Sequence, residues 1–87
     1  MIPHIELGKD VKTRHAAVRR LIRNRTIQFG GYLPGKIYGR LSCASGKKMK
    51  VENRVFFQNE QEAIKAGYRP CARCMHAAYL EWKNALF

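Results

Sequence analysis

The sequence predicts a small α+β domain with an N-terminal helix, short antiparallel strands and two C-terminal helices. Three observations support this class. Residues 9–25 have apolar side chains at helical spacing, "KIYGRL" and "RVFF" are short runs rich in β-branched and aromatic residues, and two later segments again show helical spacing. At 87 residues the chain forms one domain, 1–87, without an internal repeat or linker.

The first helix is expected within "KDVKTRHAAVRRLIRNR", with Asp10 as its N-cap. Its apolar residues recur at steps of three and four, which places them on one face. We expect His15 to be buried on that face as a hydrogen-bonded histidine. The stripe consists of Val11, His15, Val18 and Ile22, with Leu21 beside it.

Three short strands are expected next. "TIQF" begins a strand that we expect to end at Gly30-Gly31, because glycine weakens strands. "KIYGRL" and "RVFF" provide the other two, and "SCASGKKMK" between them reads as a polar loop.

Two helices are expected to close the chain. Asn59 is placed to cap "NEQEAIKAG", Glu62 stands where a capping-box acid belongs, and Gly67 ends the helix. The last segment carries apolar residues at helical steps, which we expect to lie in the core rather than to stack on nucleic-acid bases. These residues are Met75, Tyr79, Trp82 and Leu86.

The charge balance favours a polyanionic partner. Seventeen Lys and Arg against six Asp and Glu give a net charge of +11 and a pI near 10.2. Nucleic acid is the first expectation, and no apolar run approaches the ~20 residues of a membrane span. The N-terminus does not read as a signal peptide and the cysteine count is odd, so we expect a cytoplasmic, reducing location.

The three cysteines favour a metal site. Cys71 and Cys74 form a C-x-x-C pair, and Cys43 lies in a loop between two expected strands. Thiolate-rich sites prefer zinc. Two alternatives remain open from spacing alone: a redox pair, or three small buried residues.

Three stretches together resemble a known family. "KIYGRLSC", "ENRVFF" and "EAIKAGYRPCARC" are similar, in order and spacing, to the metal-binding domain at the N-terminus of the Ada-type bacterial DNA alkyl-repair proteins. The resemblance covers about residues 27–75. It implies a zinc-stabilised α+β domain with DNA as its partner, divided into an arm and helix (1–26), the zinc core (27–75) and a C-terminal helix (76–87).

One departure from the family bears on activity. The family's first loop has two cysteines; Cys43 takes the place of the second, and Gly39 stands where the first should be. In the family, that first cysteine accepts a methyl group from a DNA phosphotriester. The resemblance therefore implies that repair by this route is lost, which favours a binding module over an enzyme. The alternative is a zinc-thiolate methyl acceptor in which Cys43 reacts.

A fourth zinc ligand has to be found elsewhere. We expect His4, which lies in a short N-terminal arm that can fold back on the site, to give a Cys3His set. His15 is assigned to the core, and His76 is expected to point away from the metal. The other possibility is a water molecule in an open fourth position.

Basic residues flank the cysteines and are expected to contact nucleic acid around the metal. DNA is the expected partner, and RNA or an acidic protein are the alternatives. The set is Arg40, Lys47, Lys48, Lys50, Arg54, Arg69 and Arg73.

Overall fold

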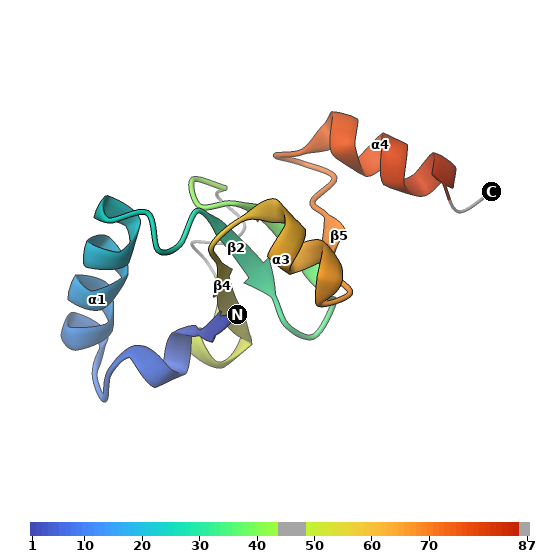
Figure 1. Ribbon diagram of the computed structural model, residues 1–87. Coiled ribbons are helices and arrows are strands. Elements are labelled where there is room, and N and C mark those ends of the chain that lie inside the picture. Colours follow the sequence, from blue (N-terminus) through green and yellow to red (C-terminus); the bar gives the residue numbers. More distant parts are fainter. Residues whose placement is uncertain (44–48, 86–87) are drawn as a thin grey trace.

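A five-stranded mixed sheet organises the computed structural model, which describes residues 1–43 and 49–85 (Figure 1). The sheet order is β1-β4-β2-β3-β5; β3 and β5 are parallel and the other neighbours are antiparallel. This confirms the α+β class. The strands are β1 (Ile2–Pro3), β2 (Phe29–Tyr32), β3 (Ile37–Arg40), β4 (Arg54–Phe57) and β5 (Arg69–Pro70).

The first two α-helices begin where the sequence places their caps. The Asp10 side chain accepts a hydrogen bond from the Thr13 backbone N–H (2.7 Å), and the Asn59 side chain accepts one from the Glu62 N–H (2.9 Å). The helix capped by Asn59 ends before Gly67, whose φ of +89° is in the region that favours glycine. The helices are α1 (Val11–Arg23), α3 (Glu60–Lys65) and α4 (His76–Ala85), with 3₁₀ turns η1 (His4–Leu7) and η2 (Val51–Asn53).

One face of the sheet carries the main core. Val55 of β4 and Tyr38 of β3 lie in one lateral row with Gly31 between them, so all three point to the same face. Together with Phe57, they pack against Ala63 of α3 and Tyr68. The Tyr38 hydroxyl donates to the Glu60 carboxylate at 2.8 Å, which attaches the start of α3 to the sheet.

The two glycines of β2 lie inside the strand, which corrects the expectation that the strand ends there. A Cβ at Gly31 would lie 2.8 Å from both Phe57 Cε2 and Val55 Cγ2, so only glycine fits beneath these core side chains. A Cβ at Gly30 would meet nothing closer than 3.9 Å. The two adjacent glycines thus differ: the core side chains of Phe57 and Val55 occupy the space beside Gly31, whereas the space beside Gly30 is open.

This difference predicts unequal effects of two matched substitutions. Gly31→Ala is expected to destabilise the domain by about 1–3 kcal/mol, because the added methyl group overpacks the core. Gly30→Ala has room for its methyl group and is expected to stay within about 0.5 kcal/mol of the wild type. Chemical denaturation of both zinc-loaded variants measures this, and equal destabilisation would contradict the assignment.

The buried face of α1 differs from the expected stripe. Ala17 is the buried residue of this helix, whereas His15 and Val11 are exposed. The helix contacts η1 rather than lying across the sheet, so a small alanine suffices at the contact. Of the other residues in the expected stripe, Ile22 is exposed, whereas Val18 and Leu21 are half-buried. His15 is therefore a surface residue and not a core histidine.

The aromatic residues of α4 are also outside the core. None of the described side chains in this helix is buried, and Figure 1 shows the helix projecting away from the sheet beyond β5. Tyr79 and Trp82 stack on each other with centroids 6.0 Å apart. The Arg69 guanidinium lies over both rings, 5.3 and 5.7 Å from their centroids. Of the other two residues expected in the core, Met75 packs against the core cluster, and Leu86 lies outside the described residues. The expectation is wrong for Tyr79 and Trp82, whose rings pack against an arginine instead.

Candidate metal centre

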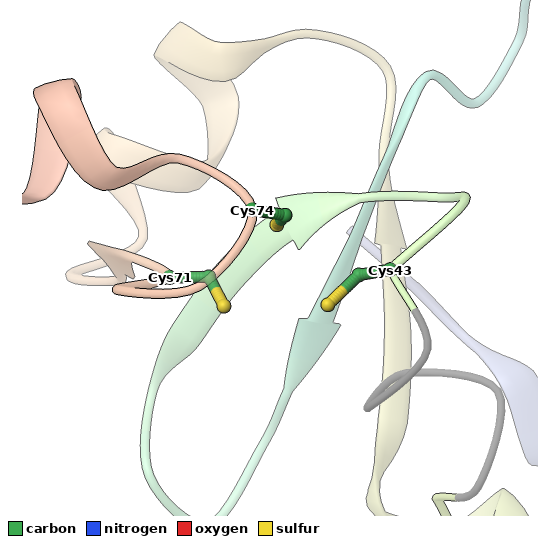
Figure 2. A group of neighbouring side chains, drawn as sticks. All are labelled: Cys43, Cys71 and Cys74. Atoms are coloured by element: carbon green, nitrogen blue, oxygen red, sulfur yellow. The ribbon is translucent and has the colours of Figure 1, made fainter.

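Three cysteine sulfurs meet at one end of β3. The Sγ atoms of Cys43, Cys71 and Cys74 all lie within 4.8 Å of one another, and Figure 2 shows the side chains converging from two segments. Cys43 lies in the turn after β3, whereas Cys71 and Cys74 lie in the loop between β5 and α4. The site therefore joins two parts of the chain that are far apart in sequence.

Backbone hydrogen bonds fix both segments. The Cys43 N–H donates to the Arg40 carbonyl (3.1 Å), which closes the turn after β3. The Cys71 N–H donates to the Tyr38 carbonyl (2.7 Å), which continues the parallel pairing of β5 with β3. The Arg40 N–H donates to Cys74 Sγ at 3.3 Å, as backbone amides do toward metal-bound thiolates.

Cys74 holds its proton when no ion is bound. Burial, and then the neighbouring Cys43 and Cys71, raise the pKa of Cys74 to about 11, against the lowering effect of the Arg40 N–H. The thiol is thus protonated at neutral pH. A metal that binds here must displace protons, which is ordinary for thiolate sites.

The spacing of the sulfurs and the surroundings of Gly39 show whether a zinc ion would fit between the cysteines. A Cβ at this residue would lie 2.7 Å from Cys74 Sγ and 3.0 Å from Cys71 Cβ, so a side chain here would enter the sulfur cluster. Tetrahedral zinc with ~2.3 Å bonds holds its sulfurs roughly 3.8 Å apart, a spacing that this cluster reaches with small adjustments. Three sulfurs are in place, and Gly39, which has no side chain, lies directly beside them.

Three cysteines that converge at the end of a strand in a small sheet define a small zinc-binding domain. A family model described as the metal binding domain of Ada matches residues 14–76, and the chain belongs to this family. No curated protein and no solved structure gives a significant match. The family and the cluster together indicate zinc as the metal.

The structure does not bring His4 to the sulfurs. The sheet order puts β1, which precedes His4, at one edge and β5, which precedes Cys71, at the other. The His4 ring packs edge-on against Phe56 with centroids 5.3 Å apart, and burial together with Arg54 and Arg14 lowers its pKa. This placement corrects the expectation that His4 is the fourth ligand: pairing of β1 with β4 holds the arm away from the metal.

The other two histidines also lie outside the cluster. His15 is exposed on α1, and His76 is exposed at the start of α4, with its Nδ1 3.3 Å from the Ala72 carbonyl. Within residues 1–43 and 49–85, the grouped metal ligands are therefore the three cysteines.

Four of the seven basic residues expected around the metal line a single cavity. It has a volume of about 400 Å³ and is also lined by Cys43 and Cys71. Lys50 is exposed before η2, and Lys47 and Lys48 lie outside the described residues. The four arginines are Arg40, Arg54, Arg69 and Arg73.

The cavity itself was not anticipated from the sequence. Its lining includes Gly30 and Gly39, which pair directly across β2 and β3 and leave that stretch of the sheet without side chains. One row along, Arg54, Tyr32, Ile37 and Arg69 pair in register across four strands. Glycine inside a strand often marks close approach of another group, and that signal was available in "FGGY" and "IYGR".

Proposed function

We propose that this chain is a zinc-stabilised module that binds DNA and does not accept methyl groups. The observation that supports it most is the gathering of four arginines on one cavity beside the metal ligands. None of the described residues lining that cavity is acidic. A phosphate backbone would meet concentrated positive charge there, and the family membership makes DNA the favoured polyanion. We also propose that the protein resides in a reducing compartment such as the cytoplasm. Residues 1–87 would form a single domain.

Arg54 illustrates why an anion suits this surface. Its Nε is buried and has no hydrogen-bond partner within the described residues, while its guanidinium lies 4.9 Å from the Phe56 centroid. Burial lowers the pKa of Arg54. The buried Nε itself is out of reach of a phosphate, but Arg54 also lines the cavity, and a charged guanidinium there favours an anionic partner.

DNA affinity is expected to fall steeply with salt. The slope of log K against log salt should be about −0.9 per phosphate contact on duplex DNA. The double variant Arg40→Gln/Arg73→Gln should make this slope shallower by about 0.9 for each phosphate that the protein no longer neutralises, and it should weaken binding to all sequences alike. Fluorescence anisotropy with a labelled duplex of mixed sequence, titrated at several salt concentrations, measures both effects.

A matched control removes the same charge from elsewhere. Arg19 and Arg23 are exposed on α1, which lies at the opposite end of the molecule from α4 (Figure 1). Arg19→Gln/Arg23→Gln is expected to leave affinity within about twofold at moderate salt, where charges beyond a Debye length of ~10 Å are screened. Equal reductions of affinity in both double variants would show that net charge, and not the cavity face, governs binding.

The absence of methyl transfer is tied to Gly39. Methyl acceptance forms an S–CH₃ bond with the thiolate electron pair while the O–CH₃ bond of the phosphotriester breaks and the phosphate oxygen keeps its electrons. Glycine offers no sulfur at the position where a side chain would enter the cluster. We propose that Cys43, the remaining sulfur of that loop, has a structural role.

Intact mass spectrometry after incubation with methylphosphotriester DNA tests this point. The wild-type chain is expected to keep its mass, whereas Gly39→Cys, which restores a sulfur beside Cys74, is expected to gain one methyl group in place of a proton. Gly39→Ala serves as the control for the added bulk. A methyl adduct on Cys43 of the wild type would make the chain a methyl acceptor and overturn the proposal.

A further inference from the structure

The cavity reaches the sulfur cluster from the side where a fourth ligand is missing. Gly39 belongs both to the cavity lining and to the cluster, since its missing Cβ would lie 2.7 Å from Cys74 Sγ. Cys43 and Cys71 also border the cavity, and their side chains flank the end of β3 in Figure 2. Cys74 Sγ and Cys71 Cβ already occupy the space next to Gly39, so the opening toward the cluster lies where Cys43 and Cys71 border a hollow large enough for a small molecule.

The number of protein ligands determines whether zinc can bind a further ligand from the cavity. Zinc is nearly always four-coordinate in structural sites, and a site with three protein ligands keeps a position for an external one. Within the described residues, only three ligand atoms are grouped there. Three thiolates on zinc leave a net charge of −1, so a further anionic donor is accepted only where positive charge offsets it.

The cavity walls supply that positive charge. Arg54 on β4 and Arg69 on β5 occupy the same lateral row, on either side of Tyr32 and Ile37, and both line the cavity. Three strand spacings separate them, or about 14 Å. A molecule that spans from the metal position toward this row can place a second anionic group near a guanidinium.

We propose that the fourth zinc position is open to the cavity and takes a small external thiol that also carries an anionic group. Zinc that already holds thiolates favours sulfur as the additional donor. The arginine lining favours a ligand with a carboxylate or similar group over a neutral thiol. This inference rests on zinc binding and not on DNA binding, so either can fail without the other.

Cobalt(II) substitution makes the fourth position visible. The thiolate-to-cobalt absorption grows with the number of bound thiolates, so mercaptoacetate added to the cobalt-loaded wild type should raise it by about one third. 2-Mercaptoethanol, the neutral thiol, should need at least tenfold higher concentration, and acetate should cause no rise. An unchanged spectrum with mercaptoacetate would overturn the proposal.

Two variants of the same residue control the interpretation. Gly39→Cys supplies a protein sulfur, so its cobalt spectrum should show four thiolates before any addition and should not respond to mercaptoacetate. Gly39→Ala adds a methyl group without a donor and should weaken mercaptoacetate binding. A response in Gly39→Cys as large as in the wild type would place the added thiol elsewhere and overturn the proposal.

A further variant tests whether the site prefers a thiol that carries an anionic group. Arg54→Gln is expected to raise the mercaptoacetate concentration needed for half-maximal absorption at least threefold, while leaving the value for 2-mercaptoethanol unchanged. Equal shifts for both thiols would contradict the role given to the arginine. Isothermal titration of the zinc-loaded protein with the same two thiols provides a second measurement that does not depend on cobalt.

Discussion

Removal of zinc by a chelator is expected to unfold the domain. Apparent zinc-binding free energies in small thiolate domains are ~10–16 kcal/mol at neutral pH, which matches or exceeds the whole stability of a typical domain. A chain of this size buries only roughly 60–65% of its unfolded surface. The ion would also tie the turn after β3 to the loop after β5, two segments that are far apart in sequence. Far-UV circular dichroism during heating, with and without chelator, measures the unfolding.

Single substitutions should distinguish the zinc ligands from His4, because only loss of a ligand should lower the zinc affinity. Cys71→Ser should reduce zinc affinity by several orders of magnitude, because serine oxygen is a poor replacement for thiolate. His4→Ala should retain zinc, since His4 packs on Phe56 at the other edge of the sheet. A chelated sample that keeps its full thermal transition, or a His4→Ala protein that releases zinc, would contradict this account of the site.

Local sequence signals predicted much of the fold. "RVFF" and "IYGR" became β4 and β3 because β-branched and aromatic residues suit a half-buried pleated surface. Asp10 and Asn59 marked the starts of α1 and α3 because each can satisfy a free backbone N–H of the first turn. The cysteine trio followed from ligand chemistry and from the family resemblance.

What the sequence did not reveal depends on pairing between distant segments. Gly31 suits the interior of β2 because the side chains of Phe57 and Val55 occupy the space beside it. The local sequence does not show that β4, which carries both residues, becomes the neighbouring strand. His4 was expected at the metal, but pairing of Ile2 with Phe56 fixes the arm at the far edge of the sheet. His15 has helical spacing with apolar residues, yet α1 contacts too little of the core to bury it.

Phe57→Ala is expected to cause the largest destabilisation among core substitutions. Its side chain has 0% exposure, packs edge-on against Tyr68 with centroids 4.9 Å apart, and lies beneath Gly31. Truncation of a buried phenylalanine costs about 3–5 kcal/mol, since it removes both transfer free energy and packing. Urea denaturation of the zinc-loaded variant measures this, with Ile64→Ala on the exposed side of α3 as a control that should change stability by less than about 0.5 kcal/mol.

The same variant tests whether the core and the metal site fold as one unit. Phe57 belongs to the core cluster, whose described members include none of the three cysteines, although Met75, the neighbour of Cys74, packs against it. Phe57 is therefore no zinc ligand, and its effect on zinc is expected to come through folding of the sheet and of the loop that carries Cys74. If the metal-free chain is unfolded, the whole effect of about 3–5 kcal/mol appears in the zinc equilibrium, which corresponds to an affinity weakened by roughly 10²–10⁴-fold. Competition with a chromophoric chelator measures this affinity. Unchanged zinc affinity in Phe57→Ala would mean that the thiolate loops assemble without the sheet, and that the ion does not supply the folding energy of this domain.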